Sequence, residues 1–388
     1  MKRIIYISSY SIIDNNQIGI ITKLLAQCNQ LSRYYAVTLL LIGDNPPVLC
    51  NNHMFIKAQE NIKIDFIYVK READSLKKIR ERYRKATKLL KYLEMQKFDF
   101  IYMRYSLADP FFLQIYKKYG NKMITEHQTK EVHELFKNGH YIYAIIELFF
   151  GSVLLSKVSG IVACTNEILE YELNRALVHK NSLVNGNGIN VESVKLKKNI
   201  FVEKNQIDIV CIASFAYWHG IDRLINGIHE YNGRKKIVLH LIGGGDGIAD
   251  IQANINQDNC SIKIYGYKNS QEIDEIFDRF DLAICSLGIH RKGLLETSEL
   301  KAREYCARGI PFITSSPDAD FPRDFSYILK FQSNEDPIDI NRIIDFYANL
   351  KADTYSSSTL RKYALENLDW KIKIEKLSVF INNTFSSI

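Results

Sequence analysis

Basic side chains and the start of a predicted helix lie close together between residues 281 and 316, in the stretch DLAICSLGIHRKGLLETSELKAREYCARGIPFITSS. Arg291 and Lys292 stand in a loop directly before that helix. Cationic side chains bind anions, and so do the unpaired amides at the start of a helix. We therefore expect a nucleotide diphosphate to bind at this stretch.

The surrounding elements would place these groups at one edge of a sheet. Leu282–Cys285 is a short apolar run typical of a buried strand, and the loop His290–Gly293 follows it. Ser298 is a candidate cap for the next helix, which ends at Arg308–Gly309 before a second strand begins at Ile310–Ile313. In open α/β sheets, ligands bind at the carboxyl ends of such strands.

Polar residues also stand at the ends of predicted strands in the first half of the chain. Met123–His127 ends in Glu126 and His127, and Arg104 ends the strand before it. Such side chains point into the ligand cleft of a parallel sheet, so all three are site candidates. The alternative for His127 is a hydrogen-bonded structural histidine. Gly19 follows a polar loop, where it either lets the backbone approach a ligand or only opens the next helix.

Strand and helix patterns alternate along the whole chain, which is typical of doubly wound parallel sheets. At 388 residues the chain exceeds what one hydrophobic core usually supports. We therefore predict an α/β protein with one domain at residues 1–190 and a second at residues 191–366. Residues 367–388 contain Trp370 and a helical apolar pattern, and we expect them to form a closing helix that packs across both domains.

The composition is that of a globular protein, with 46% hydrophobic and 24% charged residues. No signal peptide pattern opens the sequence, and the seven cysteines never form C-x-x-C. We expect reduced core cysteines in a cytoplasmic protein, with neither a metal nor a disulfide set. Residues 1–190 carry 26 Lys and Arg against 17 Asp and Glu, so the first half is the one expected to face an anionic surface.

Much of this positive charge lies in a predicted helix within residues 70–97. Its basic faces are either simply solvated or a patch for anionic lipid headgroups at the inner face of the cell membrane. No nucleic-acid motif accompanies them, so we expect no nucleic-acid partner. The apolar run His140–Leu155 is short for a membrane span, which needs about 20 residues. A core helix and an interfacial helix both remain open for it.

The sequence resembles glycosyltransferase family 4, whose members have the GT-B fold of two facing Rossmann-like domains. The motif is Glu296, Glu304 eight positions later, and then Gly309-Ile310-Pro311, between the strands DLAICSL and PFITS. Asn185-Gly186, HGIDRLI, LIGGGDG and Tyr265-Gly266-Tyr267 support the likeness. It covers nearly the whole chain, strongly in the second half and loosely in the first.

The resemblance implies retaining transfer of a sugar from a nucleotide diphosphate donor to a glycan or lipid-linked glycan, in cell-surface polysaccharide synthesis. The second domain would bind the donor and the first the acceptor, with Gly19, Arg104 and Glu126 on the acceptor side. Glu296 and His127 would contact the reacting sugar, Glu304 the ribose, and Gly266 and Tyr267 the nucleobase. Backbone amides of Thr297, Ser298 and Leu300 would bind the diphosphate, and no metal or other cofactor is expected.

One departure from the family pattern concerns the diphosphate clamp. The family commonly has Arg and Lys in the first loop of the second domain, where this sequence has Ser214 and His219. The replacements that the sequence offers are Arg291, Lys292, Lys301 and Arg303. A protonated His219 is a further option.

A second pattern invites a metal interpretation. Asp318-Ala319-Asp320 reads D-x-D, the metal motif of the other large glycosyltransferase fold. It lies between Pro317 and Pro322, and no strand pattern leads directly into it, so we expect no metal there.

Two other functions fit the same fold. A nucleotide-sugar epimerase would need acid and base groups around a sugar carbon, and these residues are not apparent in the sequence. A non-catalytic scaffold that binds sugar nucleotides would need the donor site alone.

Overall fold

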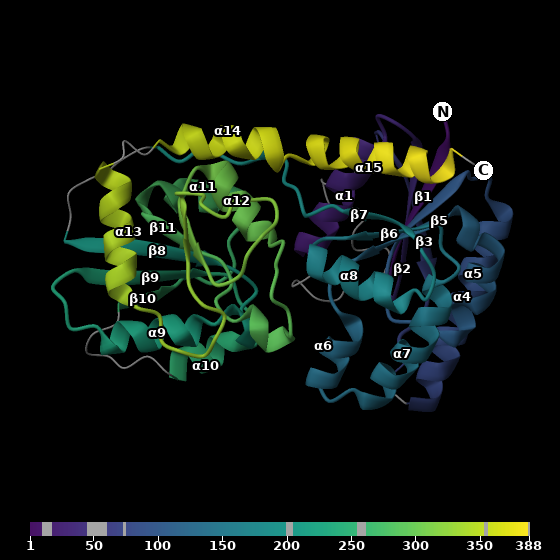
Figure 1. Ribbon diagram of the computed structural model, residues 1–388, viewed down its shortest axis with the longest axis horizontal. Helices are drawn as coiled ribbons and strands as arrows, with labels where there is room; N and C mark the ends of the chain where they lie inside the picture. The colour runs from purple at the N-terminus through teal and green to yellow at the C-terminus, as the bar shows by residue number, and fades with distance from the viewer. Residues whose placement is uncertain are drawn as a thin grey trace. The chain divides into compact units, whose positions relative to one another are not determined.

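The computed structural model describes residues 1–9, 18–44, 60–72, 75–198, 205–253, 261–352 and 356–386. The chain divides into two compact units, each an α/β layered structure (Figure 1). Unit 1 comprises Met1–Gly186 and Trp370–Ile388, and unit 2 comprises Asn187–Asp369. Part of the polar loop that precedes Gly19 lies outside the described residues.

Unit 1 is built on a parallel sheet with the strand order β3-β2-β1-β4-β5-β6-β7. The strands are β1 (Arg3–Ser9), β2 (Ala36–Gly43), β3 (Lys63–Tyr68), β4 (Phe100–Arg104), β5 (Met123–His127), β6 (Gly160–Ala163) and β7 (Asn181–Val184). The helices are α1 (Ile18–Leu31), α4 (Ser75–Met95), α5 (Leu113–Tyr119), α6 (Glu131–Lys137), α7 (Tyr141–Leu155), α8 (Asn166–Arg175) and α15 (Trp370–Phe385).

Unit 2 is built on a second parallel sheet, with the order β10-β9-β8-β11-β12-β13. The strands are β8 (Gln206–Ile212), β9 (Lys236–Ile242), β10 (Ser261–Ile264), β11 (Leu282–Ile284), β12 (Phe312–Thr314) and β13 (Ile328–Lys330). The helices are α9 (Ile221–Glu230), α10 (Gly247–Ala253), α11 (Ser270–Ile276), α12 (Leu300–Arg308), α13 (Ile340–Ala352) and α14 (Ser357–Asn367), with 3₁₀ turns η5 (Tyr217–His219) and η7 (Ile289–Lys292).

The apolar runs form the central strands because a parallel sheet is covered on both faces. Residues 4–7 of β1 and 282–284 of β11 are all buried. The α/β prediction is confirmed by both sheets. The last helix, α15, buries Trp370, Ile374 and Leu377 in the core that also holds Tyr6 of β1, so the chain returns to unit 1 at its end. No helix in the described part of the chain has the length and apolarity that crossing a membrane requires.

One capping prediction is wrong. Helix α12 begins at Leu300 with Glu299 as its N-cap, and Ser298 is not its cap. The hydroxyl of Ser298 instead accepts a hydrogen bond from the amide of Asn187 at 2.8 Å. The predicted end is confirmed, because Gly309 takes the left-handed conformation (φ 73°) that a glycine C-cap allows.

Candidate functional site

The first candidate site lies in unit 2, where the loops after β8 and β11 meet the start of α12. The carboxylate of Glu299 accepts hydrogen bonds from the amide (3.1 Å) and the hydroxyl (2.7 Å) of Ser286, directly after β11. The amide of Leu287 donates to the carbonyl of His219 at 2.8 Å. These contacts hold both loops against the start of the helix, at the carboxyl ends of the strands where α/β sheets bind ligands.

Lys301 is the cation at the centre of this site. Its Nζ lies 3.2 Å from Oε2 of Glu299, and each of the two side chains is 11% exposed. Burial lowers the pKa of Lys301, but Glu299 and the nearby thiols of Cys211 and Cys285 outweigh it and raise the pKa. Lys301 is therefore a charged amine in a largely dry environment, which is what an anionic ligand needs.

His219 is not a cation in this structure. Burial, together with the nearby charges of Lys301 and Lys292, lowers the pKa of His219 to about 2. Its Nδ1 lies 3.0 Å from the amide of Ala216, which donates to it. A neutral imidazole carries no charge to offer an anion, so a role of His219 in binding the donor stays a prediction.

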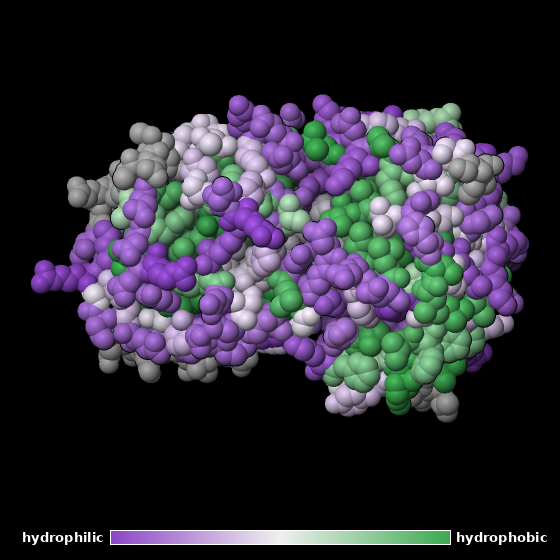
Figure 2. All heavy atoms as spheres, in the orientation of Figure 1, coloured by the Kyte–Doolittle hydropathy of each residue, from purple (hydrophilic) through white to green (hydrophobic). Residues whose placement is uncertain are grey.

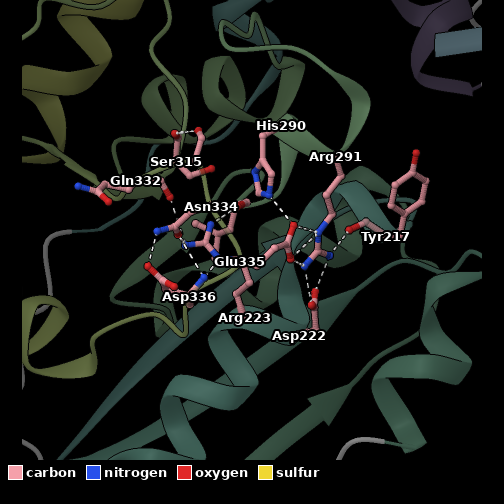
Figure 3. A network of polar contacts seen from close by, with 12 residues as sticks. Tyr217, Asp222, Arg223, His290, Arg291, Ser315, Gln332, Asn334, Glu335 and Asp336 are labelled. Carbon is pink, nitrogen blue, oxygen red and sulfur yellow. Dashed lines mark hydrogen bonds and ion pairs between the residues drawn. The ribbon is translucent and has the colours of Figure 1, made fainter. Parts of the chain in front are cut away.

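Arg291 is held by acidic side chains (Figure 3). Its Nη1 and Nη2 lie 2.9 and 2.7 Å from the carboxylate oxygens of Asp222, and its Nε lies 3.1 Å from Glu335. Nη1 also donates to the carbonyl of Tyr217 at 2.6 Å. Two carboxylates thus compensate the charge of Arg291, so it has less charge to offer an anion than Lys301 has.

The remaining two cations of the stretch differ in their surroundings. Nζ of Lys292 lies 4.9 Å from the ring centre of Trp218, a cation–π contact. Arg303 is fully buried and forms ion pairs with both Asp318 and Asp320. The D-x-D pair therefore neutralises a buried guanidinium, and Arg303 is already engaged by it.

The two family-type glutamates differ in their position relative to α12. Glu296 precedes α12, whereas Glu304 lies inside it and accepts a hydrogen bond from Nε of Arg308 at 2.8 Å. The amide of Thr297 donates to the carbonyl of Pro317 at 3.0 Å, so it is already engaged. Leu300 is the first residue of the helix.

The glycines after β9 and β10 bring two loops into contact. Gly266 has a φ of 68°, and the ring of Tyr267 after it is 60% exposed. A Cβ on Gly244 would lie 2.5 Å from that ring, so Tyr267 packs directly over the backbone of the glycine loop. An exposed aromatic face above a bare backbone is suited to stacking a nucleobase.

In unit 1, Glu126 lies in a buried polar group at the end of β5. It accepts hydrogen bonds from the hydroxyl of Tyr6 (2.7 Å), from Lys23 (3.2 Å) and from Gln27 (3.3 Å). Burial alone would raise the pKa of Glu126, but Lys23, Arg104 and these hydrogen bonds lower it. Glu126 is 3% exposed and thus serves inside the unit as the anion that compensates buried cations.

The other two acceptor-side candidates lie on neighbouring elements. Arg104 ends β4, and its buried Nη1 has no hydrogen-bond partner among the described residues. Gly19 lies in the first turn of α1. The pairing of β4 with β5 thus places Arg104 beside Glu126. Whether either touches an acceptor stays a prediction.

His127 is fully buried beside Glu126. Its Nδ1 lies 3.4 Å from Glu172 and 3.6 Å from Glu131, and its ring stacks on Tyr105 with ring centres 4.4 Å apart. Burial lowers the pKa of His127, but the two glutamates outweigh it and raise the pKa to about 10. A ring that is 0% exposed offers no atom to a sugar, so the contact that the resemblance implies stays a prediction.

Unit 1 also holds a cavity that the sequence did not reveal. It has a volume of about 440 Å³ and lies at the carboxyl ends of β1, β2 and β4, where Ser9, Gly43 and Ser106 line it. Its lining includes both charges and two aromatic rings, from Asp44, Arg71, Glu81, Arg82, Lys85, Asp109, Phe112 and Tyr143. No local pattern could have predicted it, because its walls come from segments far apart in the sequence.

An apolar surface adjoins this cavity through Tyr143. Figure 2 shows apolar residues gathered over α7. The exposed side chains on this helix, which we call the α7 face, are Tyr141, Ile142, Tyr143, Ile145, Leu148, Phe149 and Val153. Ile142 and Phe149 are 74% and 67% exposed, so the run His140–Leu155 is not a fully buried core helix. Exposed apolar surfaces of this kind commonly mark a contact with a protein or a membrane.

Solved structures resemble the chain over its whole length. A sucrose-phosphate synthase from Thermosynechococcus elongatus matches with 14% identity, 100% coverage of both chains and a TM-score of 0.71. The lipopolysaccharide outer core galactosyltransferase WaaB matches with 13% identity, 100% coverage of both chains and a TM-score of 0.64. HepE from Anabaena, in complex with UDP and glucose, matches with 11% identity, 100% coverage of both chains and a TM-score of 0.65.

These structures establish the fold of the chain, which is GT-B, as the sequence predicts. No protein-family model matches the sequence, and no curated protein matches it.

Proposed function

We propose that this chain is a glycosyltransferase that moves a sugar from a nucleotide diphosphate donor to an acceptor hydroxyl, with retention at the sugar carbon. The observation that carries the proposal is the position of Lys301, a buried charged amine at the start of α12 in a chain of GT-B fold. A leaving diphosphate develops charge that buried cations stabilise strongly. An epimerase or a binding scaffold would use the same donor site, and only transfer to an acceptor distinguishes them.

Within this proposal, each unit 2 residue has a distinct role. Lys301 and the amides at the start of α12 bind the diphosphate, with Lys292 as an outer cation. Glu304 binds the ribose hydroxyls, and Tyr267 stacks on the base. Glu296 contacts the donor sugar. Arg291 positions the loop that carries Lys292, because two carboxylates already hold its guanidinium.

The test is a thermal-shift panel with nucleoside diphosphates and their sugars. A ligand that binds the native state raises the melting temperature by mass action. At a ligand concentration 100 times Kd, the free energy of unfolding increases by about 2.7 kcal/mol. HepE, one of the structural relatives, is solved with UDP and glucose, so the uridine compounds come first. If no nucleotide of the panel shifts the melting temperature, the donor site is refuted. A shift followed by sugar transfer separates the transferase from the scaffold.

For the acceptor, we propose a lipid-linked glycan presented at an anionic membrane surface. The support is the α7 face, with its exposed apolar side chains, next to a cavity that Arg82 and Lys85 of the basic helix α4 line together with Tyr143 of α7. The cavity would bind the polar headgroup, while the α7 face would lie among lipid chains. Lys77, Lys78 and Arg80 of α4 are exposed and would meet anionic headgroups.

Flotation with liposomes tests this part separately. Vesicles with anionic lipid are expected to bind the full chain at low salt, and Ile142→Glu with Phe149→Glu is expected to abolish binding. Val379→Glu on α15 is the matched control, because Val379 is also an exposed apolar residue (54%) of unit 1 but lies away from the α7 face in sequence and structure. Equal binding by the double variant and the control would refute the proposal for the α7 face.

A further inference from the structure

A buried cluster of acidic residues surrounds His127 at the carboxyl end of β5. Glu131 from the first turn of α6 and Glu172 from α8 face the imidazole, and Glu147 from α7 lies beyond them. All four side chains are at most 8% exposed. Three carboxylates in a dry interior need compensating positive charge, because an isolated buried anion is very unfavourable.

The compensating cation that the structure pairs with these carboxylates is Arg175. Its Nη1 lies 3.2 Å from Glu172 and 3.5 Å from Glu131, and its Nη2 is paired with Glu147. Three carboxylates and one guanidinium leave a formal charge of −2 when the imidazole is neutral. One divalent cation, or two protons, would complete the balance.

The imidazole is oriented as a metal-binding histidine is. Its Nε2 lies 3.1 Å from the hydroxyl of Thr125, which can take the Nε2 hydrogen and leave a lone pair on Nδ1. That Nδ1 is buried and has no hydrogen-bond partner among the described residues. Oε2 of Glu131 has none there either, although Nη1 of Arg175 lies 3.5 Å from it. Histidine ligands commonly donate their second ring nitrogen in this way, which fixes the ring and its tautomer.

The distances suit a shared ion. Nδ1 of His127 lies 3.6 Å from Oε1 of Glu131 and 3.4 Å from Oε1 of Glu172. One ligand atom from each of the three residues lies within 4.8 Å of the others. These separations are long for hydrogen bonds. Two atoms that both lie about 2.0–2.2 Å from one ion are up to about 4.4 Å apart, so the distances from His127 to each glutamate suit a shared ion.

We propose that His127, Glu131 and Glu172 bind one divalent transition-metal ion, with Zn²⁺ or Mn²⁺ as the fitting class. One imidazole and two carboxylates favour these ions over Mg²⁺, which takes oxygen ligands almost alone. Nη1 of Arg175 lies 3.2 Å from both carboxylate oxygens of Glu172 and 3.5 Å from Oε2 of Glu131, so it compensates part of the charge of both glutamates. The ion joins β5, α6 and α8 and stabilises the end of the sheet; it takes no part in diphosphate departure, so the proposal is independent of the proposed function.

The test starts with the full-length chain after dialysis against a chelator. ZnCl₂, and in a second series MnCl₂, is titrated in a calorimeter in buffers of different ionisation enthalpy, and the melting temperature is measured with and without metal. We expect one ion per chain, release of protons on binding, and a higher melting temperature. Co²⁺ in place of Zn²⁺ is expected to give visible absorption bands that report its ligands.

Three variants decide where the ion binds. Glu131→Gln and Glu172→Gln remove one ligand each and are expected to lose the stoichiometric binding and the metal-dependent shift. Glu170→Gln is the matched control, because Glu170 lies on the same helix as Glu172 but is exposed. Melting of each metal-free variant shows whether it is folded.

The outcomes separate the metal from the proton alternative. Binding of one ion that Glu170→Gln keeps and Glu131→Gln loses, both variants being folded, supports the site. The proposal is overturned if the metal-depleted chain binds no ion stoichiometrically, since two protons then balance the cluster. It is equally overturned if a folded Glu131→Gln variant binds as the natural chain does.

Discussion

Replacing Lys301 by methionine is expected to weaken the donor site more than it weakens the fold. The substitution keeps the length of the side chain and removes its charge. At about 4 Å and an effective dielectric constant of about 20, a unit charge pair is worth about 4 kcal/mol. The ion pair with Glu299, 3.2 Å away, already neutralises part of the Lys301 charge, so the interaction with a diphosphate is weaker than this value. A loss of about 2.7–4 kcal/mol of transition-state stabilisation, or about 10²–10³-fold in kcat, is the usual result for such a group.

The effect on stability is expected to be smaller. Glu299 loses its ion pair with Lys301 but keeps the hydrogen bonds from the amide and hydroxyl of Ser286. Removing one partner of a buried polar group lowers the free energy of unfolding by about 1–3 kcal/mol, and we expect a loss in this range because Glu299 keeps its other hydrogen bonds. Urea unfolding of the natural chain and the variant measures this difference.

The assay is release of the nucleoside diphosphate from the donor that the thermal-shift panel identifies, together with its Kd by calorimetry. Lys330→Met is the matched control, because the Lys330 ammonium also lies in unit 2 but donates to the carbonyls of Pro322 and Arg323. A Lys301→Met variant as active and as tightly binding as the control would refute the role of Lys301. A second readout is the pKa of His219, which is expected to rise when the Lys301 charge is removed.

Three further predictions concern stability. Arg303→Leu is expected to lower the free energy of unfolding by about 3–5 kcal/mol, because it leaves Asp318 and Asp320 buried without their cation. Chemical denaturation measures this loss. If the double variant Arg303→Leu with Asp318→Asn is no more stable than Arg303→Leu alone, the result contradicts the pairing. Gly220→Ala is expected to lower stability by more than the roughly 1–3 kcal/mol of backbone strain alone, since φ is 64° and the new Cβ would lie 2.7 Å from the backbone of Leu287. Gly266→Ala is the control, because Gly266 has a similar φ of 68° but nothing within 4 Å of a Cβ. Equal melting temperatures of the two variants would refute the packing argument. His219 has a folded-state pKa of about 2, below the unfolded value of about 6.5, so the unfolded chain binds more protons between these values and stability falls as the pH falls. The loss is about 2 kcal/mol between about pH 6.5 and 5, and urea unfolding of His219→Gln should show less of it; identical pH profiles would contradict the neutral imidazole.

Local patterns in the sequence determined the elements and their order. Runs such as residues 4–7 and 282–284 are apolar on both faces, and only a strand covered on both sides buries them fully. Gly309 was predictable as a helix end because a left-handed C-cap depends on a few neighbouring residues. The cap at Ser298 was not, because its hydroxyl binds Asn187, 111 residues away in the sequence.

Tertiary structure alone decided which charged residues can act. The sequence offered Arg291, Lys292, Lys301 and Arg303 as candidates for a diphosphate clamp. Folding pairs Arg291 with Asp222 and Glu335, 69 and 44 residues away, while Lys301 lies 3.2 Å from the carboxylate of Glu299, its neighbour in the sequence. Charge compensation depends on distances of a few ångströms between side chains from different elements, and residue spacing within one segment carries no information about them. The cluster around His127 was not predictable for the same reason, because its glutamates come from three different helices, α6, α7 and α8.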